Sequence, residues 1–265
     1  MIKRKAVRIE RKLDTRFARS GSRKWPVQWT DVGCCSRIDW EPSLAYVRPM
    51  DASTGTEEEP TEDSRQLPKN YDALAPRLPE SGCDLFEIFG ATAEIEIVIG
   101  FGRGMFLERR TAANPDAWLL GIEIKSKWAY KVSERCKRRG LDRVRAYGGD
   151  VRQVLPNLGP DACLARAFLH FPDPWWKKRH AKRMVMGQLV LDELARLLRP
   201  GGEFFVQTDV EDRAEGYRRQ LQEHPRFELE GQGYLQGNPY DAVSNREKRA
   251  IEDGLPVYRL LALRV

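Results

Sequence analysis

From Glu94 onward the chain alternates short apolar runs with amphipathic stretches, and this alternation restricts the fold more than any other feature. Apolar runs rich in β-branched residues predict strands at 94–99, 118–124, 143–147, 163–170, 203–208 and 256–265. Amphipathic stretches predict helices near 103–112, 125–139, 151–157 and 184–198. Strands that alternate with helices are typical of a parallel sheet covered on both faces. The sequence therefore predicts an α/β domain.

The first 80 residues lack this pattern. Residues 1–30 hold ten Lys or Arg, whereas residues 51–63 hold six acidic residues and no base. Prolines recur in the later part of this region, and no helical or strand period is sustained. We therefore expect an irregular, partly disordered extension over 1–80 and a folded domain over 81–265. The basic block is either a solvated tail or an arm that follows a phosphate backbone, and the sequence leaves both open.

Composition excludes several classes of protein. The net charge is +6, and 41% of the residues are hydrophobic, which is enough for a core. The longest apolar runs have only the length of a strand, so we expect no transmembrane helix and no membrane partner. The basic N-terminus lacks the apolar segment of a secretory signal. The five cysteines show no metal-ligand spacing, so we expect reduced thiols, a cytoplasmic location and no metal.

The first predicted strand runs into a glycine-rich turn, Gly100-Phe101-Gly102-Arg103-Gly104. Glycine lets the backbone turn sharply and approach a ligand where a Cβ atom would collide. Ligands of open α/β sheets bind at the carboxyl ends of the strands, so this turn is well placed for a cofactor. Met105 occupies the position of the last glycine in the dinucleotide fingerprint, which disfavours a nicotinamide cofactor.

Two acidic residues stand at the ends of the next two predicted strands. Glu123 lies 23 residues after Gly100, which is about the separation at which a carboxylate accepts hydrogen bonds from a ribose diol. Asp150 follows the third strand, where it can accept from an adenine amine or cap the next helix. Together with the glycine turn, these acids favour a cofactor that contains adenosine.

The fourth predicted strand leads into a loop that is rigid, aromatic and basic. Two prolines fix the backbone around Asp173. Trp175 and Trp176 follow, and residues 177–183 then contain five Lys or Arg. A rigid acid, aromatic faces and a cluster that neutralises phosphate are typical of a nucleic-acid active site. The alternative for the basic cluster is a solvated run of charge.

Residues from about 85 to 265 resemble the tRNA (guanine-N7-)-methyltransferase family, whose members use S-adenosyl-L-methionine on a class I methyltransferase fold. The matching stretches are IGFGRG at 99–104, GIE at 121–123, FPDPWWKKRHAKR at 171–183 and RPGGEFFVQTD at 199–209. The stretch at 171–183 is long and unusual in composition, which makes the resemblance specific. It implies a Rossmann-like, mostly parallel sheet with an antiparallel last strand.

The resemblance also implies where the cofactor and tRNA bind, and that a guanine in tRNA, in the variable loop, is methylated at N7. The implied cofactor contacts are Val98, Gly100, Gly102, Gly104, Glu123, Asp150 and Asp173, with Asp173 as the catalytic residue. The implied RNA or guanine contacts are Lys177, Arg179, His180, Lys182, Arg183, Asp209, Ser244 and Glu247. The sequence leaves open which tRNAs are modified and whether the protein is a monomer or a homodimer.

Three features depart from the pattern of the family. The family has an acid just before the Ile-Gly of its glycine turn, where this chain has Val98, and Glu96 lies too far back along the strand to replace it. Its C-terminal Thr-x-Phe-Glu pattern is Ser244-Asn245-Arg246-Glu247 here. The N-terminal extension does not align. An RNA-binding homologue with weak or lost methyltransferase activity is therefore the alternative function.

The chemistry that the resemblance implies requires few groups. N7 of guanine carries an exposed lone pair and no proton, so its methylation needs no obligatory base. We expect the carboxylate of Asp173 to help by alignment and by stabilising the positive charge that develops on the purine. His170 and His180 are the nearest bases, and we expect neither to act as a general base.

Overall fold

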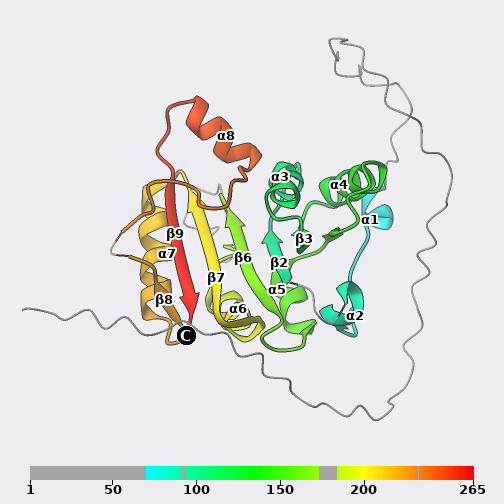
Figure 1. Ribbon diagram of the computed structural model, residues 1–265, viewed down its shortest axis with the longest axis horizontal. Coiled ribbons are helices and arrows are strands. Elements are labelled where there is room, and N and C mark those ends of the chain that lie inside the picture. The colour runs from blue at the N-terminus through cyan, green and yellow to red at the C-terminus, as the bar shows by residue number, and fades with distance from the viewer. Residues whose placement is uncertain (1–69, 91–93, 173–183, 232) are drawn as a thin grey trace, which may run out of the picture. The chain divides into compact units, whose positions relative to one another are not determined.

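The computed structural model describes residues 70–90, 94–172, 184–231 and 233–265, and within these residues seven strands form one sheet (Figure 1). The strand order is β4-β3-β2-β6-β7-β9-β8. The bounds are β2 (Glu94–Ile99), β3 (Ala117–Glu123), β4 (Val144–Gly148), β6 (Leu164–His170), β7 (Leu198–Thr208), β8 (Phe227–Leu229) and β9 (Tyr258–Arg264). The strands from β4 to β7 run parallel, while β9 is antiparallel to both β7 and β8. The expected mostly parallel sheet with an antiparallel last strand is therefore confirmed.

The predicted strands are all present, and the largest difference is at the start of β7. The predicted strand begins at residue 203, after two glycines, but the observed strand already begins at Leu198, which pairs with Leu164. The register then shifts before Arg166 pairs with Glu203, and Gly201 has φ of +73°. The glycines therefore form an irregularity within β7 rather than a turn before it. In addition, β1 (Cys83–Asp84) and β5 (Leu158–Gly159) form a separate parallel pair, which no pattern in the sequence indicates.

The predicted helices correspond to α3 (Met105–Ala113), α4 (Ser126–Arg138), α5 (Val151–Val154) with the 3₁₀ helix Leu155–Asn157, and α6 (Gln188–Leu197). Four further helices are α1 (Tyr71–Leu74), α2 (Leu85–Phe89), α7 (Glu211–Glu223) and α8 (Asn245–Glu252). Within α7 only Ala214, Tyr217 and Leu221 are buried. So few apolar residues give a weak periodic signal, which is why the sequence did not reveal this helix. No helix in the described part of the chain is long and apolar enough to cross a membrane.

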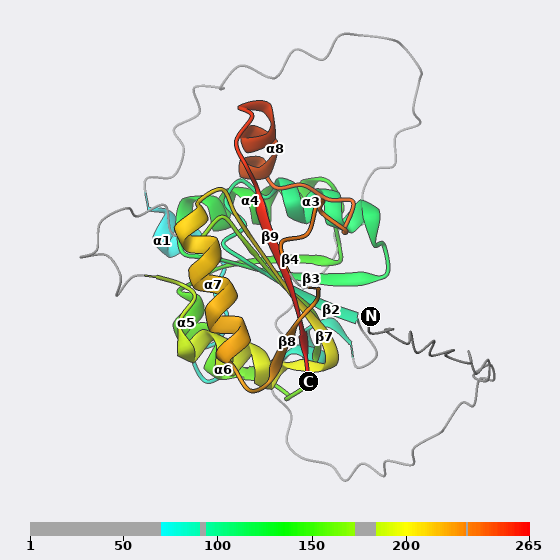
Figure 2. The same ribbon diagram turned by 90° about the vertical axis from the view of Figure 1, so that its left-hand side faces the viewer.

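The core lies on both faces of the sheet, because successive side chains of a strand point to opposite faces. Phe204 and Val206 belong to one apolar cluster together with residues of α6 and α7. Phe205 belongs to the other cluster, together with residues of α3 and α4. Figure 2 shows α3 and α4 on one side of the strands and α5, α6 and α7 on the other. The central strands are thus buried on both faces, as expected for a parallel sheet.

Residues 71–76 pack on the α/β domain, although the sequence places them in the extension. The ring of Tyr71 in α1 lies 5.9 Å from that of Tyr130 in α4. Ala75 is buried, and the amide of Gly148 at the end of β4 donates to the carbonyl of Pro76 at 2.7 Å. This segment therefore extends the domain beyond β4. The part of the predicted extension before residue 70 lies outside the described residues.

Candidate functional site

A cavity of about 570 Å³ lies at the carboxyl ends of the parallel strands. Its wall includes the turn after β2, the residues after β6 and β7, and the first turns of α8, which lies above the strand ends in Figure 1. Of the residues predicted for the site, Gly100, Gly102, Asp209 and Ser244 line this cavity. This edge is where open α/β sheets bind their ligands.

The glycine turn has the backbone conformation that its sequence predicts. Gly100 and Gly102 have φ of +71° and +55°, in the left-handed region that other residues rarely adopt. A Cβ atom added at either position would meet no described atom within 4 Å, so the backbone borders open space. At Gly104, with φ of +84°, the added Cβ would lie 2.8 Å from Cγ1 of Val132. The first two glycines therefore permit a ligand to approach the backbone, whereas Gly104 permits α4 to pack closely.

Glu123 is fixed by two backbone amides at the end of β3. Its Oε2 accepts a hydrogen bond from the amide of Gly102 at 2.8 Å, and its Oε1 accepts from the amide of Lys125 at 2.9 Å. The residue is 5% exposed. Because each carboxylate oxygen can accept a second hydrogen bond, the two oxygens of Glu123 remain able to bind the two hydroxyl groups of a ribose. These groups fit the adenosine part of a cofactor.

Asp150 lies beside Glu123, since the amide of Gly149 donates to the carbonyl of Glu123 at 3.0 Å. Oδ1 of Asp150 accepts from the amide of Arg152 at 3.0 Å, so the residue caps α5 as the sequence allowed. Hydrogen bonds from the Arg152 side chain lower the pKa of the Asp150 carboxyl group. The carboxylate is therefore a permanent acceptor near neutral pH, and its contact with adenine stays a prediction.

Val98 is not part of the cavity wall. Its side chain is fully buried in the apolar cluster that contains Phe106, Phe168 and Phe205. The side chain of Val98 therefore packs in the core, and the predicted cofactor contact at this residue stays a prediction.

Glu96, on the same face of β2, is held in a buried ionic cluster. Its carboxylate accepts from Arg110 at 2.7 and 2.8 Å and from Arg166 at 2.9 Å. Asn114 donates to it as well, at 3.2 Å. All these partners lie away from the glycine turn. The expectation that Glu96 does not replace the missing acid is thus confirmed.

The first turn of α8 forms one wall of the cavity, and a buried carboxylate holds it in place. Ser244 caps the helix, and its hydroxyl accepts from the amide of Glu247 at 3.1 Å. Glu247 has no exposed surface. It accepts hydrogen bonds from Gln207 at 2.8 Å, Arg259 at 3.0 Å and Asn238 at 3.1 Å. The carboxylate of Glu247 therefore positions α8, and a direct contact with substrate stays a prediction.

Several residues of the wall were not identified from the sequence as site residues. Arg246 forms an ion pair with Asp209, and both side chains line the cavity. Trp128 in α4 also lines it, and the guanidinium of Arg103 lies 5.4 Å from the centre of its ring. The only indication of Trp128 in the sequence is that an aromatic residue stands there, shortly after Glu123. Nothing local in the sequence indicates that Arg246 would face Asp209.

His170 also lines the cavity, at the end of β6. Burial lowers its pKa to about 3, so the imidazole is neutral at physiological pH. A general base is most effective when its pKa lies near the operating pH. The structure thus agrees with the expectation that His170 is not a general base.

The acidic and basic residues of the loop lie outside the described residues. They are Asp173, Lys177, Arg179, His180, Lys182 and Arg183. Phe171 and Pro172, which lead into this loop, line the cavity. The predicted catalytic and RNA contacts of the loop therefore remain predictions.

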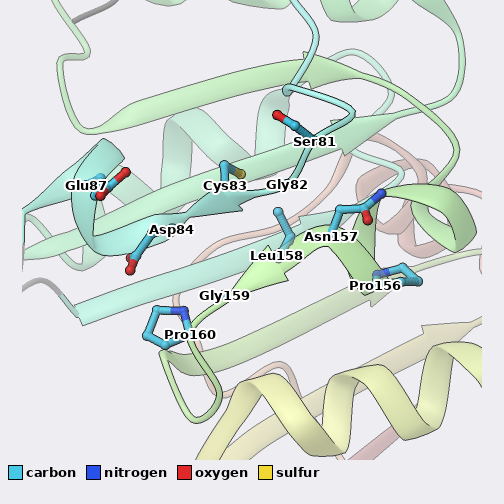
Figure 3. Close-up of a pocket in the computed structure, with 10 residues that line it drawn as sticks. All are labelled: Ser81, Gly82, Cys83, Asp84, Glu87, Pro156, Asn157, Leu158, Gly159 and Pro160. Carbon is cyan, nitrogen blue, oxygen red and sulfur yellow. The ribbon is translucent and has the colours of Figure 1, made fainter. Parts of the chain in front are cut away.

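A second cavity, of about 450 Å³, lies where β1 runs beside β5 (Figure 3). Its lining contains two acidic residues, Asp84 and Glu87, and Asp84 caps α2 by accepting from the amide of Phe86 at 2.7 Å. Burial raises the pKa of the nearby Cys83 thiol. Among the described residues, no group of three or more His, Cys, Asp or Glu is arranged to hold a metal ion.

The sheet with its antiparallel β9, and the glycine turn hydrogen-bonded to Glu123, define a class I methyltransferase, whose methyl donor is S-adenosyl-L-methionine. A family model described as "Putative methyltransferase" matches residues 92–260. Similarity to curated proteins is more specific, and it shows that the chain belongs to the tRNA (guanine-N(7)-)-methyltransferase family.

Two of these relatives are enzymes named tRNA (guanine-N(7)-)-methyltransferase. The protein from Synechococcus sp. (strain JA-3-3Ab) is 36% identical over 165 residues, covering 62% of this chain and 70% of the relative. The protein from Rhodospirillum rubrum is 38% identical over 175 residues, covering 64% of this chain and 68% of the relative. Among solved structures, the 16S rRNA methyltransferase KamB matches with a TM-score of 0.49 and 14% identity, covering 68% of this chain and 92% of that chain.

Proposed function

We propose that this protein transfers a methyl group from S-adenosyl-L-methionine to N7 of a guanine in the variable loop of tRNA, forming N7-methylguanosine. The observation that carries the proposal is the hydrogen bond between the Gly102 amide and the Glu123 carboxylate, which lies at the edge of the cavity. The names of the relatives support tRNA as the substrate. We place the reaction in the cytoplasm, where tRNA is modified and used.

The described residues fit the two ends of such a cofactor differently. Glu123 accepts from the ribose hydroxyls, and Asp150 accepts from the adenine amine. The backbone at Gly100 and Gly102 adjoins open space, so it can approach the methionine end. The family has an acid at the position of Val98, and no described residue of this chain takes its place. The site for the methionine end therefore relies on backbone groups.

The bound cofactor supplies an electrophilic methyl group on a sulfonium. N7 of guanine would donate its lone pair to form the new N–CH₃ bond, while the electrons of the S–CH₃ bond would stay on sulfur. The positive charge moves to the purine, and no proton is transferred in this step. In the proposal, the carboxylate of Asp173 stabilises that charge. The neutral state of His170 is consistent with a step that needs no base.

The loop after β6 supplies the RNA contacts in this proposal. Lys177, Arg179, His180, Lys182 and Arg183 bind phosphates, because neutralising phosphate charge dominates the affinity of proteins for nucleic acids. Asp209 and Ser244 contact the target nucleotide. Their position on the cavity wall supports this assignment.

A second candidate is an RNA-binding homologue with weak or lost methyltransferase activity. It is favoured by Val98, whose fully buried side chain replaces an acid of the family pattern. Calorimetric titration with S-adenosyl-L-methionine separates the two candidates. An affinity too weak to measure, combined with tight tRNA binding, would support the homologue.

The decisive experiment is transfer of a radiolabelled methyl group to bulk tRNA, followed by nucleoside analysis. We expect the label in N7-methylguanosine, and we expect it to vanish with the Asp173→Asn variant. Transcripts in which each variable-loop guanine is replaced in turn then locate the modified position. Label in another nucleoside, or in a guanine outside the variable loop, would contradict the corresponding part of the proposal.

A further inference from the structure

His170 and Gln207 face each other across two neighbouring strands at the edge of the cavity. They are register partners in the β6–β7 pair, and Nδ1 of the imidazole lies 2.8 Å from Nε2 of Gln207. The histidine is 8% exposed. The rings of Phe106 and Phe168 pack against it, with centroids 4.1 and 5.9 Å away. These contacts hold the imidazole in one orientation.

The neighbours of Gln207 determine which nitrogen of His170 carries the proton. Glu247 forms an ion pair with Arg259 at 3.0 Å, and both of its carboxylate oxygens accept hydrogen bonds from Asn238. The amide group of Gln207 that faces Glu247 at 2.8 Å must therefore be the NH₂ group. Its second hydrogen is donated to Nδ1 of His170, which makes Nδ1 an acceptor. The proton of the neutral ring consequently lies on Nε2.

Nε2–H is a buried donor without an acceptor among the described residues. Buried polar groups in native proteins nearly always have a hydrogen-bond partner, and an exception calls for a specific explanation. This one belongs to a residue that lines the cavity at the end of β6. A molecule bound in the cavity is therefore the natural source of the missing acceptor.

We propose that His170 selects guanine by donating a hydrogen bond from Nε2–H to O6 of the target base. The proposal rests on the proposed function, in which guanine N7 is the atom methylated. On this edge of guanine both N7 and O6 are acceptors, whereas adenine carries an amino group in place of O6. A fixed hydrogen-bond donor beside N7 therefore favours the binding of guanine over that of adenine. His170 acts here as a specificity residue, and it neither gives up nor takes up a proton.

Base binding requires a small movement of the cavity wall. Nε2 itself has less than 1 Å² of exposed surface. The Phe106 ring lines the cavity and its centroid is 4.1 Å from that of the imidazole, so we expect this ring to shift when the base binds. The donor is thus covered before the base enters and is paired afterwards.

The test combines an enzyme variant with an altered substrate. One tRNA carries guanine at the target position, and the other carries 2,6-diaminopurine, which keeps N7 but has an amino group in place of O6. The variant is His170→Phe, because phenylalanine preserves the aromatic packing and lacks the donor. The matched control is His224→Phe, since His224 is also buried but bonds to Asp192, away from the cavity.

For the wild-type protein and His224→Phe, we expect diaminopurine to lower kcat/KM about 5- to 100-fold, the range typical of a buried donor left unpaired. For His170→Phe, kcat/KM on guanine should fall by a similar factor, and the two substrates should then differ less than about threefold. The affinity for S-adenosyl-L-methionine should not change. Effects of diaminopurine on the RNA itself cancel, because every protein receives the same pair of substrates.

If His170→Phe lowers kcat/KM on both substrates by the same factor, the residue is structural and the proposal is wrong. If the wild-type protein methylates no guanine in tRNA, the proposed function fails, which is a different result. The tautomer has an independent test in long-range ¹⁵N–¹H NMR spectra of the wild-type protein. We expect the proton on Nε2, and a proton on Nδ1 would overturn the assignment without any variant.

Discussion

The amide nitrogen of Gly102 lies 2.8 Å from Oε2 of Glu123, although the two residues stand at the ends of different strands. Because β2 and β3 are parallel neighbours, both groups reach the same edge of the sheet. The hydrogen bond fixes the turn relative to the carboxylate before any ligand binds. A site organised in this way loses little conformational freedom on binding.

The first prediction concerns the charge of Glu123. Glu123→Gln preserves the shape of the side chain but removes the negative charge that accepts from ribose. We expect affinity for S-adenosyl-L-methionine to fall about 10- to 100-fold, since hydrogen bonds to charged groups contribute about 1.5–3 kcal/mol. Calorimetry measures the change. Glu134→Gln is the control, because Glu134 pairs with Lys137 on the exposed side of α4. Equal affinities for Glu123→Gln and wild type would exclude the proposed role.

The second prediction concerns the close packing at Gly104. In Gly104→Ala, the residue must keep φ of +84°, and its Cβ would lie 2.8 Å from Val132. We expect a loss of about 2–4 kcal/mol in the free energy of unfolding, from backbone strain and overpacking together. Gly140→Ala is the matched control, since Gly140 has φ of +63° and no described atom within 4 Å of the added Cβ. Denaturant titration should show a loss of only about 1–2 kcal/mol there. Equal losses would show that Val132 moves aside freely.

The sequence predicted the strands and the glycine turn because their signals are local. Glu94–Ile99 is an unbroken apolar and β-branched run apart from its two glutamates, and the glycines follow at once. The observed β2 has the same bounds as the prediction. The spacing from Gly100 to Glu123 also identified an acid that the structure joins to the turn. Patterns within one strand–turn–helix unit are therefore sufficient for this part of the site.

The rest of the site depends on contacts that are distant in sequence. Glu247 looks like a surface residue in the polar stretch 245–249, yet it is fully buried because Gln207 and Arg259 surround its carboxylate. In the same way, α8 has only two buried residues, so its apolar pattern could not reveal it. The burial of Val98 beside Phe168 and Phe205 likewise depends on strand pairing and helix packing. Sequence periodicity contains no information on such partners.

The third prediction concerns the acid that is missing at position 98. Val98→Glu places a carboxylate at a site with no exposed surface and with apolar neighbours. We expect the free energy of unfolding to fall by on the order of 3–5 kcal/mol, because Arg110, whose guanidinium lies 5.8 Å from the centre of the Phe168 ring, is already paired with Glu96 and the new charge would be buried among apolar side chains. Val98→Gln has the same shape without the charge and should lose less. Tighter binding of S-adenosyl-L-methionine by a stable Val98→Glu protein would contradict the assignment of Val98 to the core.

The last prediction concerns the pH dependence of stability. Burial lowers the pKa of His170 to about 3, from an ordinary value near 6.5. Between these two values the unfolded chain binds a proton at this residue and the folded protein does not. Stability therefore rises with pH in this window, with a slope that approaches about 1.4 kcal/mol per pH unit, and above the window this contribution is constant. His170→Phe should remove that slope. Denaturant titrations of both proteins between pH 4.5 and 8 measure this slope. His224→Phe is a second comparison, because His224 is a buried histidine that has a carboxylate partner.

The free energies of unfolding of wild type and His170→Phe could instead change with pH in parallel. In that case His170 takes up a proton as readily in the folded protein as in the unfolded chain, and the buried, neutral state described for its ring is wrong.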